Sequence, residues 1–342
     1  MIMSKIYNTD GYVNWEYLYQ QTPAFCMVTG ARATGKTYGL LKYCVENSIK
    51  FLYLRRLGTQ LQQCASENAN PFKKLNTDCG WNIQPYKKRD MVLFTESTYN
   101  DGKKVATGET VAVGAALSTF ATLRGVDFSD IDAIVFDEAI PMVGEKPIKN
   151  EFDAFNNFYE SVNRNRELEG SPPVKCFLLG NANQLANPYY AGWGFMRTAL
   201  NMIRGGQMMY RAPEGNRIMV MLLNSPISGK KRETALYRGA SKDFASMALD
   251  NAFKTDETHI KPRKLSELLP LCGVGEIGIY RIKSGGLYVS NTVPKDVYYD
   301  AHGIRLKMFR RDLAILRPSY LRGSISFEDY NAELIFRDIV DI

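Results

Sequence analysis

Residues 24–37 read Ala24-Phe25-Cys26-Met27-Val28-Thr29-Gly30-Ala31-Arg32-Ala33-Thr34-Gly35-Lys36-Thr37, and this stretch decides the fold class. Its first six residues form a short, nearly continuous apolar run, which is typical of a buried strand. Residues 37–45 then carry apolar side chains at helical spacing. The glycine-rich loop between them matches G-x-x-x-x-G-K-[ST] in full, the pattern whose backbone amides surround phosphate groups. The stretch therefore predicts a phosphate-binding P-loop between a strand and a helix.

The residue types inside the loop predict how a nucleotide and a metal ion would be held. We expect Lys36 to reach the β- and γ-phosphate oxygens of ATP, and the Thr37 hydroxyl to ligate Mg²⁺. Arg32 adds a second cation, which we expect to touch phosphate or a neighbouring acidic group. The predicted nucleotide-binding residues here are Gly30, Ala31, Arg32, Ala33, Thr34, Gly35, Lys36, Thr37 and Tyr38.

A second apolar run, residues 133–136, ends in the carboxylates Asp137 and Glu138. At the carboxyl end of a strand beside the P-loop, Asp137 can hold Mg²⁺ through water, beside Thr37, while Glu138 polarises the attacking water. An apolar run followed by two acids is common where strands simply end in solvent. Combined with the P-loop, however, it predicts ATP hydrolysis with Glu138 as the catalytic carboxylate.

Two further motifs supply candidate catalytic residues. The apolar run 174–179 is followed by Gly180 and Asn181, which places an amide where it could sense the γ-phosphate; a simple polar turn is the alternative. Between the acidic pair and this run, Arg164 and Arg166 could form ion pairs on a helix face. Either could instead be donated to the γ-phosphate of a neighbouring subunit, and Arg164 is the preferred candidate.

The order of the segments predicts an α/β fold. Buried-strand candidates at 24–29, 51–54, 133–136, 174–179 and 217–223 alternate with predicted helices at 37–45 and 152–166, which indicates a mostly parallel sheet of the P-loop (ASCE/RecA-like) class. Residues 81–116 interrupt this pattern as a β insertion with a turn at 100–102. The predicted domains are 1–227, a P-loop ATPase domain; 228–252, a basic linker; and 253–342, a small α+β domain with a hairpin at 277–290.

Composition and charge limit the classes of protein that need considering. The net charge is +7, and residues 201–342 carry 22 Lys and Arg against 16 Asp and Glu. Such a basic excess suits a nucleic-acid backbone, although a solvated basic face is the alternative. The six cysteines show no paired spacing and the two histidines are isolated, so disulfides and zinc are not expected. No secretion leader and no membrane-spanning segment is predicted.

Taken together, these motifs resemble the DNA-packaging ATPases of phi29-type tailed phages, a branch of the terminase motors. The residues that carry the resemblance are 30–37, 53–56, 134–138, 164–167, Asn181-Ala182, 187–189, Lys231-Arg232 and 246–251. The resemblance implies a homo-oligomeric ring, expected to have five subunits, that uses ATP and Mg²⁺ to drive double-stranded DNA into a procapsid through its portal. It places the protein in the host cytoplasm and transiently at the portal vertex, and leaves open whether a structural RNA binds.

The same resemblance implies roles for two further residues and a fold for the tail. Tyr7, in Tyr7-Asn8, matches the family's aromatic near the base, and Arg55 its strand-end arginine beside the nucleotide. The tail is implied to be RNase H-like. A two-metal nuclease needs clustered carboxylates, and residues 277–290 contain none, while Asp296, Asp300 and Asp312 form no recognisable set. We therefore expect a nuclease-inactive domain that binds nucleic acid or the portal.

Other classes of P-loop protein remain as alternatives. A GTPase would need Asn-Lys-x-Asp, which residues 181–184 do not supply, and a two-lobed helicase would need a longer tail. Another DNA-dependent ATPase, helicase-like or DNA-remodelling, and a nucleotide-binding scaffold without turnover stay open. Glu138 argues against the scaffold.

Overall fold

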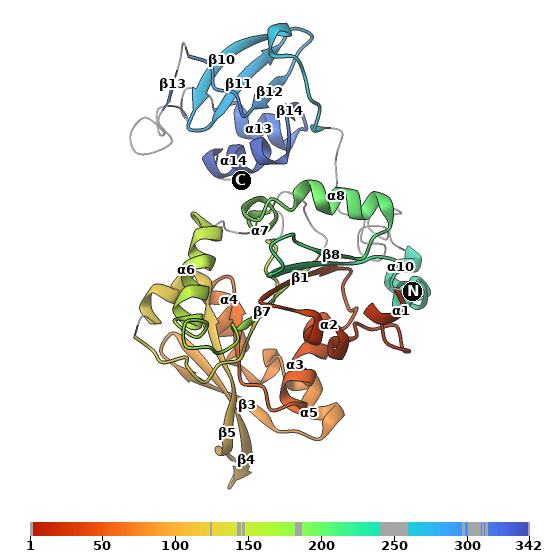
Figure 1. Ribbon diagram of the computed structural model, residues 1–342, viewed down its shortest axis with the longest axis vertical. Helices are drawn as coiled ribbons and strands as arrows, with labels where there is room; N and C mark the ends of the chain where they lie inside the picture. The colour runs from red at the N-terminus through yellow and green to blue at the C-terminus, as the bar shows by residue number, and fades with distance from the viewer. Residues whose placement is uncertain are drawn as a thin grey trace. The chain divides into compact units, whose positions relative to one another are not determined.

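The computed structural model describes residues 3–123, 125–141, 145, 148–181, 187–239, 259–295, 298–299, 309, 311 and 314–340. Ala182, residues 246–251, Asp296, Asp300 and Asp312, named above, lie outside this described part. The chain divides into two compact units: 1–140, 152–182 and 200–252 form the first, and 141–151, 183–199 and 253–342 form the second. Figure 1 shows the elements of both units. The domain boundaries at 228 and 253 remain a prediction.

A nine-stranded sheet forms the first unit, in the order β3-β4-β5-β2-β6-β7-β1-β9-β8. In that order the strands are Ile83–Lys88, Met91–Asn100, Lys103–Ala116, Phe51–Arg55, Ala133–Phe136, Lys175–Asn181, Phe25–Gly30, Arg217–Leu222 and Met209–Arg211. The six strands from β5 to β9 are parallel, and the outer β3, β4 and β8 pair antiparallel. Continuous burial of β6, and of β1 beyond its first residue, is what a parallel sheet covered on both faces requires. This architecture confirms the predicted α/β class.

The parallel strands bring the predicted motifs to one edge of the sheet. β1 pairs with β7 so that Gly30 lies opposite Asn181, and β6 pairs with the other side of β7. The P-loop follows β1 and leads into α3 (Lys36–Glu46), while Asp137 and Glu138 follow β6 directly. Carboxyl ends of parallel strands are where α/β proteins bind their ligands.

Helices accompany the large sheet. They are α1 (Met3–Ile6), α2 (Trp15–Gln21), α4 (Gly58–Cys64), α5 (Lys73–Cys79), α6 (Glu151–Asn163), α7 (Pro188–Gly192), α8 (Met196–Gly205), α9 (Pro226–Arg232), α10 (Ala235–Gly239) and the 3₁₀ helices Glu67–Ala69 and Leu117–Leu123. Of these, α7 and the first residues of α8 belong to the second unit. The helix predicted for 152–166 ends early, at Asn163, because Arg164 takes a left-handed conformation with φ +47°. Arg164 and Arg166 therefore lie in the turn after α6.

The predicted β insertion is confirmed as the β4–β5 hairpin. Its turn residues Asp101 and Gly102 have φ values of +49° and +73°, the left-handed pair that a two-residue hairpin turn needs. β3 lies within the predicted insertion 81–116 but was not predicted as a separate strand, and it forms the edge of the sheet. Pro85 lies in its middle, and a proline is tolerated in a strand only at such an edge.

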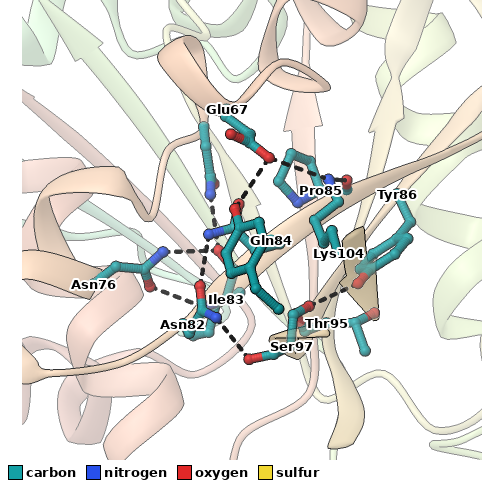
Figure 2. Close-up of polar contacts among 12 residues, drawn as sticks. Glu67, Asn76, Asn82, Ile83, Gln84, Pro85, Tyr86, Thr95, Ser97 and Lys104 are labelled. Carbon is teal, nitrogen blue, oxygen red and sulfur yellow. Dashed lines mark hydrogen bonds and ion pairs between the residues drawn. The ribbon is translucent and has the colours of Figure 1, made fainter. Parts of the chain in front are cut away.

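Polar side chains cover the backbone of this edge strand (Figure 2). Asn76 donates to the Ile83 carbonyl at 2.9 Å and accepts from the Ile83 amide at 3.0 Å, and Asn70 donates to the same carbonyl at 2.8 Å. Lys104 donates to the Pro85 carbonyl at 2.8 Å, and its ammonium lies 4.8 Å from the centre of the Tyr86 ring. Occupied in this way, the edge offers fewer free backbone groups to another strand.

A separate five-stranded sheet forms the second unit, in the order β13-β10-β11-β12-β14. These are Tyr298–Tyr299, Leu268–Val274, Ile277–Ile282, Leu287–Ser290 and Ile325–Phe327, accompanied by α13 (Leu316–Leu321), α14 (Tyr330–Val340) and the 3₁₀ helix Leu265–Glu267. β11 and β12 confirm the predicted hairpin, with Gly285 and Gly286 both at positive φ in its turn. The core joins strand and helix residues such as Ile279, Phe327 and Phe336.

The strand pairing of this second sheet bears on the RNase H-like expectation. β13 pairs in parallel with β10, and β14 pairs in parallel with β12 at the opposite edge. These pairings do not decide the RNase H-like assignment, which stays a prediction. Within the part of the chain that the structure describes, no three His, Cys, Asp or Glu side chains gather closely enough to hold a metal ion. None of the described helices has the length and apolar character needed to cross a bilayer.

Candidate nucleotide-binding site

The conformation of the P-loop depends on two left-handed backbone positions and on the N-terminal segment that packs on the loop. Ala33 and Gly35 have φ values of +59° and +83°, and a Cβ at residue 35 would lie 3.1 Å from the Tyr12 ring. Trp15 Nε1 donates to the Gly35 carbonyl at 3.2 Å. At the other end of the loop, a Cβ on Gly30 would lie 2.6 Å from Leu222 Cβ. Gly30 is therefore required by close packing, and Gly35 by its left-handed conformation.

Lys36 points into the loop and is almost completely buried. Its Nζ donates to the carbonyls of Gly30 at 2.9 Å and Ala31 at 2.7 Å, and to Asn181 Oδ1 at 3.3 Å. Burial lowers the pKa of Lys36 to about 7; the charge of Asp137 opposes this effect, whereas Lys231 and Arg32 add to it. A bound phosphate would supply the missing negative charge. The predicted sensor Asn181 thus lies beside the predicted phosphate-binding lysine.

Thr37 and Asp137 contact each other, as a shared metal site requires. Thr37 Oγ1 donates to Asp137 Oδ1 at 2.6 Å, and the Tyr53 hydroxyl donates to Asp137 Oδ2 at 2.8 Å. A hydroxyl and a carboxylate are oxygen ligands of the kind that Mg²⁺ prefers, so the donor set fits this ion. Tyr53 was named only as part of the resemblance at 53–56, without a role beside Asp137. It lies on β2, which pairs with β6, two residues before β2 ends.

Arg55 pairs with both carboxylates that follow β6, Asp137 and Glu138. Arg55 Nη1 donates to Asp137 Oδ2 at 2.9 Å, and its Nη2 donates to Glu138 Oε2 at 2.5 Å. Glu138 has φ +52°, an uncommon conformation for a side-chain-bearing residue and one often found at functional sites. The Arg55 side chain is 12% exposed and that of Glu138 is 55% exposed. The strand-end arginine predicted to lie by the nucleotide therefore bridges the two carboxylates, while Glu138 remains accessible to water.

The aromatic residues near the loop differ in their exposure. Tyr7 is buried and donates its hydroxyl to the Leu223 carbonyl at 3.0 Å, so its ring presents no open face for a base. Tyr12, which the sequence argument did not single out, is 44% exposed and packs on Gly35. Tyr38, at the start of α3, donates its hydroxyl to Asp78 of α5 at 2.8 Å. Tyr12 is therefore the most exposed of these three rings, and it contacts the loop at Gly35.

A lysine from a distant part of the sequence also reaches the loop. Lys231 Nζ of α9 donates to the Arg32 carbonyl at 2.6 Å. In the sequence, Lys231 belongs to the basic run 230–232 and to the resemblance at Lys231-Arg232, and neither assigned it a role at the loop.

The structure does not bring the two candidate arginine fingers to the loop of their own chain. Arg164 Nη2 donates to the Val126 carbonyl at 2.9 Å, and Arg166 Nη1 donates to the Ile131 carbonyl at 2.6 Å. Arg166 also pairs with Asp132, the residue before β6, at 3.1 Å. These contacts lie at the amino ends of β6 and β7, whereas the P-loop lies at the carboxyl ends.

These features define a P-loop protein with a mostly parallel sheet. A model of the podovirus DNA encapsidation protein (Gp16) family matches residues 7–270, and the chain belongs to this family.

Individual phage proteins described as DNA packaging proteins are also similar to this chain in sequence. The DNA packaging protein of Bacillus phage PZA is 26% identical over 246 residues, which cover 70% of this chain and 65% of that protein. The DNA packaging protein of Bacillus phage phi29 is 29% identical over 168 residues, 48% of this chain and 44% of that protein. The chain thus spans less than two thirds of the length of these relatives.

A solved structure shares the fold over the whole chain. The structure described as the Phi-28 gp11 DNA packaging motor matches 98% of this chain and 99% of its own, with a TM-score of 0.63 and 18% sequence identity.

Proposed function

We propose that this chain hydrolyses ATP to drive double-stranded DNA into a procapsid, as one subunit of a homo-oligomeric ring that we expect to contain five copies. The observation that carries the proposal is the contact of Thr37 with Asp137 beside the buried Lys36, because it joins the P-loop to the acidic strand end in one site. Family membership supplies the link to DNA encapsidation. The same description of the relatives supports action at the procapsid in the host cell.

The residues of the site suggest how each would act. Lys36 would exchange its carbonyl acceptors for phosphate oxygens, and Asn181 beside it would respond to the γ-phosphate. Thr37 and Asp137 would hold Mg²⁺, which neutralises charge on the phosphates when bound. Glu138 would orient the attacking water. Because Arg55 holds Glu138 in this structure, its release from Arg55 would have to precede that step.

The remaining parts of the chain complete the proposal. Residues 1–227 would carry the ATPase, 228–252 would form the linker, and 253–342 would bind nucleic acid or the portal without cutting DNA. The excess of basic residues after residue 200 supports nucleic-acid binding, which should weaken steeply with salt.

Steady-state ATP turnover by the full-length chain tests the proposal. Turnover should rise when double-stranded DNA is added and when the chain concentration is increased, because assembly completes the sites. The Lys36→Ala chain controls for contaminating ATPases. Bound ATP without turnover would favour the scaffold, and turnover indifferent to DNA would contradict a packaging role.

A further inference from the structure

Two lysines from different parts of the chain share the carbonyls of one loop. Lys36 donates hydrogen bonds to the carbonyls of Gly30 and Ala31. Lys231 donates to the next carbonyl along the loop, that of Arg32, at 2.6 Å. Lys36 belongs to the P-loop itself, whereas Lys231 comes from α9, near the end of the first unit. Successive carbonyls of a phosphate-binding loop are thus occupied by ammonium groups.

The electrostatic surroundings of Lys231 lack an opposite charge. The structure records no ion pair between Lys231 and any residue that it describes, and its partner at Arg32 is a neutral carbonyl. The side chain is partly buried, and this burial lowers the pKa of Lys231. Lys36 donates to the two preceding carbonyls of the same loop, so a second ammonium group is bound to this loop beside that of Lys231. A partly buried cation beside another cation gains stability from a nearby anion.

A second contact fixes α9 against the loop. A Cβ on Gly11 would lie 2.7 Å from Pro226 Cβ, so the first residue of α9 packs tightly on the N-terminal segment. That segment reaches the P-loop through Val13, whose amide donates to the Thr34 carbonyl at 3.1 Å. α9 is therefore joined to the loop at both of its ends, by packing at Pro226 and by the lysine at its last turn.

We propose that Lys231 is a further phosphate-binding residue of the nucleotide site, and that it couples nucleotide occupancy to α9. When a nucleotide binds, the ammonium would leave the Arg32 carbonyl for a phosphate oxygen, which is the stronger, charge-assisted acceptor. This movement would pass to α9, which precedes the C-terminal part of the chain. The assignment rests on the proposed ATP site and adds a residue to it.

Three variants of the full-length chain test the assignment. Lys231→Met removes the ammonium and keeps most of the side-chain length, Lys231→Arg keeps the charge, and Lys230→Met removes the same charge from the exposed neighbouring residue. Affinity for Mg·ATP is measured by calorimetry, and amide hydrogen exchange in residues 226–239 is compared with and without nucleotide. Thermal unfolding checks that each variant is folded.

The expected results separate this assignment from the proposed function. Lys231→Met should weaken Mg·ATP binding about tenfold or more, Lys231→Arg should restore most of it, and Lys230→Met should stay within about twofold of wild type. Saturating nucleotide should change exchange in 226–239 in wild type but not in Lys231→Met. Equal affinities for the two methionine variants would overturn the role of Lys231 alone. If Lys231→Met does not fold, two other results would overturn the assignment. One is a folded Lys231→Arg chain that binds Mg·ATP as weakly as Lys36→Ala, and the other is wild type without any exchange response to nucleotide. Failure of wild type to bind ATP would overturn both proposals.

Discussion

At the scale of single residues, Lys36 and Glu138 lie in one site with contrasting surroundings. Lys36 is 8% exposed and surrounded by carbonyls, and the Glu138 side chain is 55% exposed and held by one arginine. A buried ammonium group surrounded by carbonyls can bind a negatively charged phosphate, while an accessible carboxylate at the strand end can position water. Their substitutions should therefore affect different steps.

Lys36→Ala should abolish most ATP binding, and Glu138→Gln should bind ATP with near wild-type affinity but turn it over about 10²–10⁴-fold more slowly. Equilibrium binding and single-turnover hydrolysis separate the two effects. Glu145→Gln, an acidic residue without an assigned role, serves as the matched carboxylate control. Turnover by Glu138→Gln within about tenfold of wild type would show that another group activates the water.

Sequence alone predicted these two residues because each belongs to a motif at the end of a buried strand. It placed Tyr7 near the base, but Tyr7 is buried and Tyr12 is the exposed ring beside Gly35. It assigned no role to Lys231, because the contact with Arg32 joins residues 199 positions apart. Such contacts depend on how α9 packs, which no local pattern reports.

At the scale of elements, the edge strand β3 depends on side chains from outside the strand. Asn76 makes two hydrogen bonds with Ile83, a residue that is 1% exposed, so these backbone groups have little access to water (Figure 2). Leaving a buried backbone group without a partner costs about 1–3 kcal/mol. The Ile83 carbonyl would keep its bond from Asn70, whereas its amide would lose the Asn76 acceptor.

Asn76→Ala should accordingly lower the free energy of unfolding by about 1–3 kcal/mol and expose part of the edge to association with other chains. Urea unfolding measures the first effect and light scattering at increasing concentration the second. Asn157→Ala, on an exposed position of α6, is the control for a loss of amide elsewhere. An Asn76→Ala chain as stable and as monodisperse as this control would mean that the edge does not need the asparagine.

Element prediction succeeded where one local signal was sufficient. The continuous apolar runs gave β1 and β6, and Asp101-Gly102 gave the hairpin turn. β3 was missed because Pro85 argues against a strand until its edge position is known. The end of α6 was placed too late, because a left-handed Arg164 follows no sequence rule for helix ends.

At the scale of the whole molecule, the position of Arg164 requires a second copy if it is to act on phosphate. Its guanidinium is anchored by the Val126 carbonyl and Asp127, at the amino ends of the strands, and its side chain is 49% exposed. The P-loop lies at the opposite ends of the same strands. In a ring, head-to-tail packing brings opposite faces of neighbouring subunits together, which would let this arginine complete the next site.

Mixing two inactive variants tests this arrangement. Arg164→Ala should reduce turnover about 10³-fold or more while leaving ATP affinity largely intact, as removal of an arginine finger does. Combining Arg164→Ala chains with Glu138→Gln chains, in the presence of DNA, should restore part of the activity, because some interfaces then pair an intact Glu138 with an Arg164 donated by the neighbour. Arg211→Ala controls for loss of a surface arginine; Arg211 lies on β8 and donates to the Gln21 carbonyl of α2. Energy transfer between labelled chains shows whether the two variants mix. If they mix and no turnover returns, Arg164 does not complete a neighbour's site, and it acts in its own subunit or has a structural role.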